Sequence, residues 1–523
     1  MGMNTLETPI LDLGGDRVTL RDIAQNVLVT GVTGGGKTSG PGRHLFTGLL
    51  MAECGGIVLC AKPGEADEVL AMCRKAGRLA STIVWNGRNG GFNFLDYALA
   101  KLGPDGINGV IEQFLRIVEM TRNASALQAS NGEAFWLDEL RRMLRHALPV
   151  IHAATGTLRM ADILAFVRSA PTEAGQMRDP AWQRQNGFFV RCFADAAGRM
   201  DDATGERMVA FWDEFSRMDG KLRGSILAGF TMLDRFNHGW LRDAFCGGTS
   251  LPPALCLMGV VIILDMPRAT MGEDGMVAQM LYKDALQTDI LGRNALAPMH
   301  RERFCFIYGD EAQEFLTSRD AEFLAMSRSS RCGTIYLTQS LPGVYAKIGG
   351  QNAHDRAHHL ISNMGVRIFC ANSCTTTNDW ASQVIGKTVQ RRASFNASEG
   401  SNSSYGSNMG MGTNEGSNHG WGTNNSYSSG PNGNSTSSGS SWNEGRSEGS
   451  NESRGYNHGS GTNRGTSHGW SENVDFLVQP GFFARGLKTG GPANGNRVSA
   501  VWFQAGRTFA ASGGNALVVE FQQ

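Results

Sequence analysis

An eight-residue phosphate-loop pattern constrains the fold of this chain more than any other feature. Residues 31–38 read Gly-Val-Thr-Gly-Gly-Gly-Lys-Thr, a complete match to Gly-x-x-x-x-Gly-Lys-[Ser/Thr]. The apolar run at 26–30 predicts a short buried strand before the loop, and residues 39–51 can begin a helix after it. Such a turn points consecutive backbone N–H groups at one anion, and the helix N-terminus adds partial positive charge. The sequence therefore predicts a nucleoside triphosphate site.

The residue types in the loop indicate which atoms contact the nucleotide. Lys37 is expected to reach the terminal phosphates, and the Thr38 hydroxyl is expected to hold Mg²⁺. ATP and Mg²⁺ are therefore the expected ligands. A glycine-rich turn that matches by chance is the alternative, and the complete pattern in a strand–turn–helix setting disfavours it. The residues expected to contact nucleotide are Gly31, Thr33, Gly34, Gly35, Gly36, Lys37, Thr38 and Ser39.

A pair of acidic residues much later in the chain can complete the site. Residues 303–311 read Arg-Phe-Cys-Phe-Ile-Tyr-Gly-Asp-Glu, and the apolar run in them is typical of a strand buried on both faces. Open α/β sheets bind ligands at the carboxyl ends of their strands, where this run ends. Asp310 can hold Mg²⁺ through water, and Glu311 can polarise the attacking water. The alternative is a solvated acidic pair at a strand end.

Further apolar runs indicate the rest of the sheet. Residues 331–340 predict a strand that ends at Gln339, which can sense the γ-phosphate or, alternatively, only cap the strand. Residues 257–265 and 56–60 predict two more buried strands. Because these strands alternate with helical stretches, the sequence predicts an α/β fold with a doubly wound, mainly parallel sheet.

Composition excludes several classes of protein. The chain has 48 basic and 48 acidic residues, so it lacks the bulk positive charge of a DNA-coating protein, although basic groups lining a pore remain compatible. No apolar run approaches the ~18–20 residues of a membrane-spanning helix, and residues 1–21 lack the apolar core of a secretory signal. Ten scattered cysteines without a Cys-x-x-Cys pair predict buried free thiols in a reducing compartment.

The motif spacing predicts one nucleotide-binding domain interrupted by two insertions. Residues 107–119 and 135–151 carry amphipathic helical patterns and predict an all-α domain. The runs at 498–503 and 516–521 predict strands that return to the sheet or its edge. The expected segments are 1–103 and 251–393 for the two parts of the nucleotide-binding domain, 104–250 for the all-α insertion, 394–473 for a low-complexity insertion, and 474–523 for the closing strands.

The low-complexity insertion differs in kind from the rest of the chain. Residues 394–473 contain 17 Gly among many Ser and Asn, and they contain no Leu, Ile or Val. Such a segment cannot bury enough apolar surface to offset its chain entropy, so disorder is expected. Its histidines recur in near-repeats at 418–424, 457–463 and 467–470 but lack Cys or acidic co-ligands, which favours a polar linker over a metal site. Its Trp and Tyr side chains can stack on bases or on a partner.

A series of short motifs accompanies the nucleotide-site residues in a set order. They are Thr38-Ser39-Gly40-Pro41-Gly42, Lys62-Pro63-Gly64-Glu65, Phe92-Asn93-Phe94-Leu95-Asp96, Phe135-Trp136, Leu241-Arg242-Asp243-Ala244-Phe245, Asp310-Glu311-Ala312-Gln313, Thr338-Gln339-Ser340 and Ile385-Gly386-Lys387. In order and spacing they resemble the type IV secretion coupling proteins, the TraD/TraG group of conjugative DNA-pumping ATPases. The resemblance covers most of residues 25–390, and residues 474–510 are similar to the family's closing segment.

This resemblance implies a RecA-like P-loop NTPase that forms a hexameric ring, with nucleotide at the subunit interfaces and DNA in the central channel. It implies that Asp310 and Glu311 hydrolyse ATP and that Gln339 couples the two halves of the site. It also implies that Arg328 reaches the nucleotide of a neighbouring subunit. Arg331 is the alternative for that role, and a solvated surface arginine is the other interpretation of Arg328. The all-α insertion is implied to face the cytosolic entrance and to help choose the substrate.

The chain also departs from the family pattern. Family members usually begin with membrane-spanning helices, which this sequence lacks, so a cytoplasmic protein is expected, or one recruited to the bacterial inner membrane by a membrane-bound partner. Cys60 and Ala61 stand where the family often has an acidic residue, so no nucleotide contact is assigned there.

The function expected from these features is an ATP-driven motor. It would deliver single- or double-stranded DNA, or a relaxase–DNA complex, to a type IV secretion channel. Two alternatives remain open: a cytoplasmic DNA translocase of the segregation or end-resection type, and a substrate-recruiting adaptor that uses ATP only to assemble. DNA-stimulated hydrolysis separates a motor from an adaptor.

Overall fold

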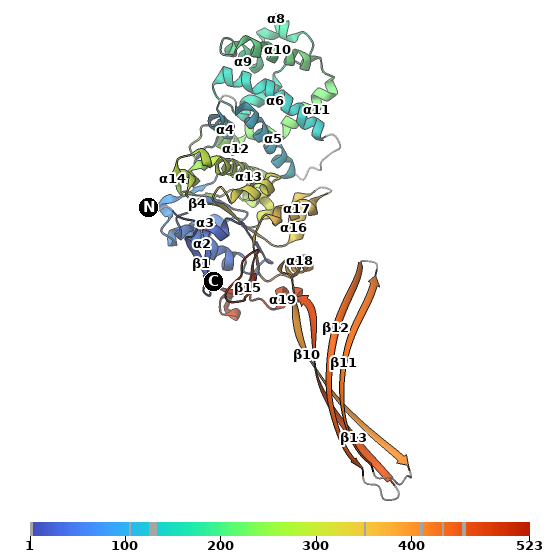
Figure 1. Cartoon of the computed structure of the whole chain (residues 1–523). Helices are drawn as coiled ribbons and strands as arrows, with labels where there is room; N and C mark the ends of the chain where they lie inside the picture. The colour runs from blue at the N-terminus through green and yellow to red at the C-terminus, as the bar shows by residue number, and fades with distance from the viewer. Residues whose placement is uncertain are drawn as a thin grey trace. The chain divides into compact units, whose positions relative to one another are not determined.

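The computed structural model describes residues 4–103, 106–124, 133–349, 352–406, 412–430, 433–451 and 457–523 (Figure 1). The chain divides into two compact units. The first comprises Met1–Asn378 and Gly481–Gln523, and the second comprises Asp379–Pro480. Because the second unit interrupts the first, the low-complexity segment lies within an insertion, and the predicted closing strands belong to the main unit.

A nine-stranded sheet organises the described part of the first unit, in the order β15-β14-β9-β3-β8-β7-β4-β6-β5. The strands from β9 to β5 pair in parallel, whereas β14 pairs antiparallel with both β9 and β15. The predicted α/β fold with a mainly parallel sheet is therefore confirmed. Its strands are β3 (Val27–Thr30), β4 (Gly55–Leu59), β5 (Thr82–Trp85), β6 (Val261–Leu264), β7 (Cys305–Gly309), β8 (Cys332–Thr338), β9 (Val366–Phe369), β14 (Arg497–Gln504) and β15 (Ala516–Gln522).

The central strands are apolar because helices cover them. Every residue of β3, β4, β6, β7 and β8 is buried. Phe46 on the helix after the phosphate loop packs its ring 5.7 Å from Phe306 and 5.2 Å from Tyr308, both on β7. The helices of this part are α1 (Leu20–Ile23), α2 (Arg43–Met51), α3 (Glu65–Lys75), α13 (Arg268–Gly292), α14 (Pro298–Arg301), α15 (Arg319–Ser327), α16 (Leu341–Ile348), α17 (Ala353–Ser362) and α19 (Pro480–Arg485), and a short hairpin joins β1 (Pro9–Leu13) to β2 (Asp16–Thr19). Helix α18 (Thr375–Ile385) begins in the first unit and continues into the second.

The described residues between β5 and β6 contain helices and no strand. Helix α13 supports this region: Tyr97 donates a hydrogen bond to Asp289 at 2.6 Å, and Arg116 forms an ion pair with Asp284 at 3.0 Å. The domain boundaries at 104 and 250 remain a prediction. The helices are α4 (Phe94–Leu102), α5 (Ile107–Ala124), α6 (Glu133–Thr155), α7 (Met160–Arg168), α8 (Pro180–Arg184), α9 (Phe188–Ala196), α10 (Asp202–Arg217), α11 (Gly220–Thr231) and α12 (Gly239–Phe245).

Two predicted elements are shorter than expected. A π-turn covers Thr38–Gly42, and the regular helix begins only at Arg43, because Pro41 lacks an N–H and Gly40 has non-helical backbone angles. The strand predicted at 257–265 begins at Val261. The residues before it form a 3-10 turn, Pro253–Met258, that ends at Gly259 with a φ of 96°. In both places glycine and proline residues, and not the pattern of apolar residues, determine where the regular helix or strand begins.

The cysteines and the helix lengths add two observations. The predicted free thiols are confirmed: all ten cysteines are unpaired, and nine of them are buried.

Among the described residues, no single helix is long and apolar enough to cross a membrane. The helices at Leu137–Thr155 and Met160–Arg168 reach that length and composition only as a pair, which is bent by 114°.

The second unit consists largely of long extended strands. Strand β10 (Lys387–Gly406) pairs antiparallel with β13 (Asn457–Phe476), and β11 (Gly412–Gly430) pairs antiparallel with β12 (Gly433–Asn451). In the described part of the chain these strands form two separate two-stranded sheets and join no larger sheet, which fits the predicted low-complexity insertion without an apolar core. Antiparallel ladders need only backbone N–H and C=O groups, so a segment without branched aliphatic residues can pair without an apolar core.

Candidate functional site

The phosphate loop connects β3 to the π-turn before α2, as its sequence predicts. Thr33 and Gly34 are exposed at the tip of the turn, whereas Gly35, Gly36 and Lys37 are buried. Gly36 has a φ of 84°, and a Cβ there would lie 2.5 Å from a methyl carbon of Val498 on β14. The glycine at this position is therefore required by both backbone conformation and space.

Residues from two distant segments meet at the end of this loop. The Thr38 hydroxyl donates a hydrogen bond to Asp310 Oδ2 at 2.8 Å, and Lys37 Nζ lies 3.4 Å from Glu311 Oε1. Lys37, Asp310 and Glu311 are all about 5% exposed or less. The structure therefore brings the predicted phosphate-binding and acidic residues together at the carboxyl ends of β3 and β7, the two strands on either side of β8.

Glu311 lies at the centre of a hydrogen-bond network. Its Oε1 accepts from Lys62 Nζ at 2.8 Å, and Gln339 Nε2 lies 3.1 Å from both carboxylate oxygens. Its Oε2 also accepts from Gln313 Nε2 at 2.9 Å. Burial raises the pKa of Glu311, but the hydrogen bonds from Lys62, Gln313 and Gln339 outweigh it and lower that pKa to about 2. Glu311 is therefore a carboxylate at any ordinary pH.

The backbone conformation at Glu311 places the side chains of the site close to one another. Glu311 has a φ of 47° and a ψ of 46°, a left-handed conformation that is uncommon outside glycine. Its N–H donates to Asp310 Oδ1 at 2.9 Å. Gln339 is held by Asn372, whose side-chain amide donates to the Gln339 carbonyl at 3.0 Å. The Gln339 side chain contacts Glu311 directly, which is more than ordinary strand capping requires.

Lys62, Glu65 and Gln313 belong to the network but were not predicted as site residues. Lys62 Nζ also lies 3.7 Å from Asp310 Oδ2. Glu65 Oε2 accepts from the backbone N–H groups of Ala61 at 2.9 Å and Lys62 at 3.2 Å. Burial and then the nearby charge of Asp310 raise the pKa of Glu65 to about 7. Of these three residues, only Lys62 carried a signal in the sequence. It lies just after a predicted buried strand, and Asp310 and Gln339 lie in the same kind of position.

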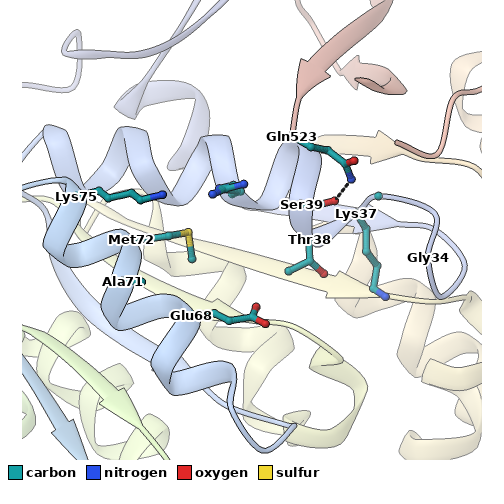
Figure 2. Close-up of a pocket in the computed structure, with 11 residues that line it drawn as sticks. Gly34, Lys37, Thr38, Ser39, Glu68, Ala71, Met72, Lys75 and Gln523 are labelled. Carbon is teal, nitrogen blue, oxygen red and sulfur yellow. Dashed lines mark hydrogen bonds between the residues drawn. The ribbon is translucent and has the colours of Figure 1, made fainter. Parts of the chain in front are cut away.

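A cavity of about 560 Å³ opens beside the phosphate loop. Figure 2 shows Lys37, Thr38 and Ser39 on one side of it and the side chains of α3 on the other. Gln523 Nε2 donates to the Ser39 hydroxyl at 2.6 Å, so the residue that follows β15 also borders the cavity. The α3 residues that line it are Glu68, Ala71, Met72 and Lys75.

The residues present fit a magnesium ion bound together with phosphate. Mg²⁺ in phosphate sites is usually held by one or two protein oxygens plus phosphate and water. The Thr38 hydroxyl and the Asp310 carboxylate supply those two oxygens at a mutual distance of 2.8 Å. No cluster of three or more His, Cys, Asp or Glu side chains that could hold a metal occurs in the described part of the chain.

Arg328 and Arg331 lie away from this cluster. Both precede β8 at its amino end, whereas the phosphate loop follows β3 at its carboxyl end, and β3 and β8 are parallel neighbours. Arg331 donates to the Glu302 carbonyl at 2.7 Å. Arg328 is exposed, and its guanidinium forms no hydrogen bond or ion pair within the described residues. With Arg21, these two arginines line a separate cavity of about 420 Å³.

Comparison with known proteins identifies the fold. No family model and no curated protein sequence matches this chain. Among solved structures, the bacterial conjugative coupling protein TrwBΔN70 in its unbound monoclinic form is similar, with a TM-score of 0.56 and 13% identity, over 98% of this chain and 88% of that one. Its trigonal form with sulphate has a TM-score of 0.49, 15% identity, and 75% and 84% coverage. VirB4 of Thermoanaerobacter pseudethanolicus has a TM-score of 0.40, 14% identity, and 74% and 95% coverage. The first similarity confirms the predicted α/β fold with a mainly parallel sheet, which this chain shares with TrwBΔN70.

Proposed function

We propose that this protein is an ATP-hydrolysing motor that recruits DNA or a nucleoprotein complex and delivers it to a type IV secretion channel. The observation that carries the proposal is the convergence of Asp310, Glu311 and Gln339 on Lys37 and Thr38 of the phosphate loop. Lys37 and Thr38 also line the cavity of about 560 Å³. The likeness to the fold of TrwBΔN70, a conjugative coupling protein, supports the transport role.

The chemistry follows from where each side chain lies. Phosphoryl transfer needs positioning and charge stabilisation more than covalent help from the protein. Lys37 binds the terminal phosphates, because it is buried at the loop end where an anion would face the backbone N–H groups. Glu311 orients and polarises the attacking water, and Gln339 holds the Glu311 carboxylate. Thr38 and Asp310 hold Mg²⁺, which would neutralise charge on the β- and γ-phosphates.

We further propose that the working form is a homo-hexamer in which Arg328 acts on the neighbouring subunit's nucleotide. The seven residues of β8 extend over roughly 23 Å. Arg328 therefore lies too far from its own phosphate loop to contact a nucleotide there. Its guanidinium is exposed and pairs with no residue in the described part of the chain, which suits contact with another subunit, whereas Arg331 is already bound to the Glu302 carbonyl.

ATPase rates with and without DNA test the motor proposal. The purified full chain should hydrolyse ATP, and single- or double-stranded DNA should raise the rate, whereas Lys37→Ala should abolish hydrolysis under both conditions. Particle size measured with nucleotide should show a hexamer. Hydrolysis that is insensitive to DNA would contradict the motor and favour an adaptor that uses ATP to assemble. Absence of nucleotide binding would contradict both.

A further inference from the structure

The Glu311 carboxylate has more donors than it can use while it activates water. Oε1 faces Lys62 Nζ at 2.8 Å, Gln339 Nε2 at 3.1 Å and Lys37 Nζ at 3.4 Å. Oε2 faces Gln313 Nε2 at 2.9 Å and Gln339 Nε2 at 3.1 Å. A carboxylate has about four acceptor sites. Lys37 turns to the terminal phosphates when they bind, and the four contacts that remain still fill these acceptor sites. One further donor must therefore leave before Glu311 can accept a proton from water.

Lys62 is the exposed cation among the remaining donors, so it is the one that an anion would draw away. Gln339 is also exposed but is neutral, and the Gln313 side chain is fixed because its Oε1 accepts from the Thr338 hydroxyl at 2.8 Å. The Lys62 side chain is 53% exposed, and in the described part of the chain its ammonium contacts only Glu311 and Asp310. Its backbone is anchored by Glu65, so the side chain can swing while the loop stays in place.

A terminal phosphate would give the Lys62 ammonium a stronger partner. Lys62 and Lys37 both contact the same oxygen, Glu311 Oε1, so their ammonium groups lie within reach of one phosphoryl group. A γ-phosphate carries three anionic acceptor oxygens, and charge-assisted hydrogen bonds to phosphate are among the strongest in proteins. A diphosphate bound in the same loop would lack this group.

We propose that Lys62 detects the γ-phosphate: it occupies Glu311 when no triphosphate is bound, and it moves to the γ-phosphate when ATP binds. This role rests on the proposed ATPase function and deepens it. The same movement adds a cation to the phosphate site and releases an acceptor position on Glu311 for water. Lys62 thereby makes Glu311 available only when there is a phosphate to transfer.

Binding of two nucleotides to three full-length proteins tests this role. A non-hydrolysable ATP analogue and ADP would be titrated by calorimetry, with Mg²⁺, into the wild type, Lys62→Met and Lys347→Met. Methionine keeps the length of the side chain and removes the charge. Lys347→Met is the matched control, because Lys347 is also a half-exposed lysine in an ion pair, 2.7 Å from Glu314.

Lys62→Met should bind the ATP analogue at least ~10-fold more weakly than the wild type, since it loses a charge-assisted hydrogen bond to the γ-phosphate. It should bind ADP within about twofold of the wild type, and Lys347→Met should match the wild type for both nucleotides. Equal weakening for ADP and the analogue, or no weakening for either, would overturn the role of Lys62. If the wild type binds neither nucleotide, the proposed ATPase function itself is overturned, and this role with it.

Discussion

At the scale of single residues, Glu311 combines a strained backbone with a strongly bound side chain. Left-handed angles at a non-glycine residue cost of order 1–3 kcal/mol and persist where the surroundings fix them. Here the conformation places two consecutive carboxylates in one cluster, with Asp310 toward Thr38 and Glu311 toward Lys37. An extended backbone would send consecutive side chains to opposite faces. The strain is thus linked to the arrangement that the proposed chemistry needs.

Replacing Glu311 separates binding from hydrolysis. Glu311→Gln removes the charge that polarises water but keeps an amide oxygen that can accept from Gln339. Turnover should fall about 10²–10⁴-fold, the typical effect of removing a general base, while ATP binding persists. Steady-state ATPase and equilibrium binding measured on the same preparation check this, with Lys37→Ala as the variant that should lose binding instead. Near-normal hydrolysis by Glu311→Gln would remove Glu311 from the mechanism.

Glu65 should make stability depend on pH in the direction opposite to Glu311. The pKa of Glu65 is raised from 4.5 to about 7, so its contribution to folding is present below pH 4.5 and is lost as pH rises to about 7. The pKa of Glu311 is lowered to about 2, so its contribution is present above pH 4.5 and is lost as pH falls toward 2. These windows do not overlap.

Glu65→Gln tests the upper window. The amide oxygen can still accept from the N–H groups of Ala61 and Lys62, but it no longer titrates. Relative to the wild type, the variant should therefore gain stability between about pH 5 and pH 7.5. Urea unfolding at several pH values measures this difference. A difference that stays constant across the range would show that Glu65 does not titrate there.

At the scale of elements, a buried charge pair joins α13 to α15 behind the acidic loop. Lys283 Nζ donates to Asp320 Oδ2 at 2.5 Å and to the Phe315 carbonyl at 2.6 Å, and both charged side chains are at most 1% exposed. Tyr336 on β8 also donates to Asp320, at 3.2 Å. Burial lowers the pKa of Lys283. The pair therefore fixes the position of α15, which ends beside Arg328.

Breaking this pair should destabilise the protein strongly. Lys283→Met leaves the Asp320 carboxylate buried without its cation, which typically costs about 3–5 kcal/mol. The double variant Lys283→Met/Asp320→Asn removes both charges and should be less destabilised than the sum of the two single variants. Urea and thermal unfolding of all three variants measure the coupling. Strict additivity would mean that the two side chains do not stabilise each other.

The sequence predicted which segments form strands of the sheet better than it predicted where those strands begin. Runs such as Phe304–Tyr308 identify central strands because parallel strands are apolar on both faces. The strand predicted at 257–265 begins only at Val261, because Gly259 adopts left-handed backbone angles that interrupt it. The pattern of apolar residues alone does not show this interruption.

The sequence predicted those residues of the candidate site that belong to a motif with a defined chemical role. Lys37, Thr38, Asp310, Glu311 and Gln339 all lie in the cluster. Lys62 and Gln313 could not be assigned in the same way, because their roles depend on contacts that only the fold creates. Lys62, for example, meets a carboxylate 249 residues away.

At the scale of the whole molecule, the proposed ring predicts complementation between two inactive variants. Arg328→Ala damages the site of the neighbouring subunit and keeps its own phosphate loop, whereas Lys37→Ala does the reverse. Mixed rings should therefore recover part of the ATPase activity, since trans-acting arginines raise turnover by ~10³–10⁵ in phosphoryl-transfer sites. Activity across mixing ratios measures this, with Arg331→Ala as the comparison. No recovery in rings proven to contain both variants would leave Arg328 a surface residue.

Removing the low-complexity insertion should leave the main unit intact. Ala393 and Trp470 face each other across the β10–β13 ladder, so replacing residues 394–469 with Asn-Gly closes the remaining strands through a two-residue turn. The melting temperature and nucleotide binding should change little, because the insertion belongs to a separate compact unit and contains no branched aliphatic residue that could fill the core. Delivery of cargo in cells should fail if its Trp and Tyr side chains contact DNA or a channel partner. Thermal unfolding of the deletion variant decides the point, and a large loss of stability would show that the insertion packs on the nucleotide-binding domain.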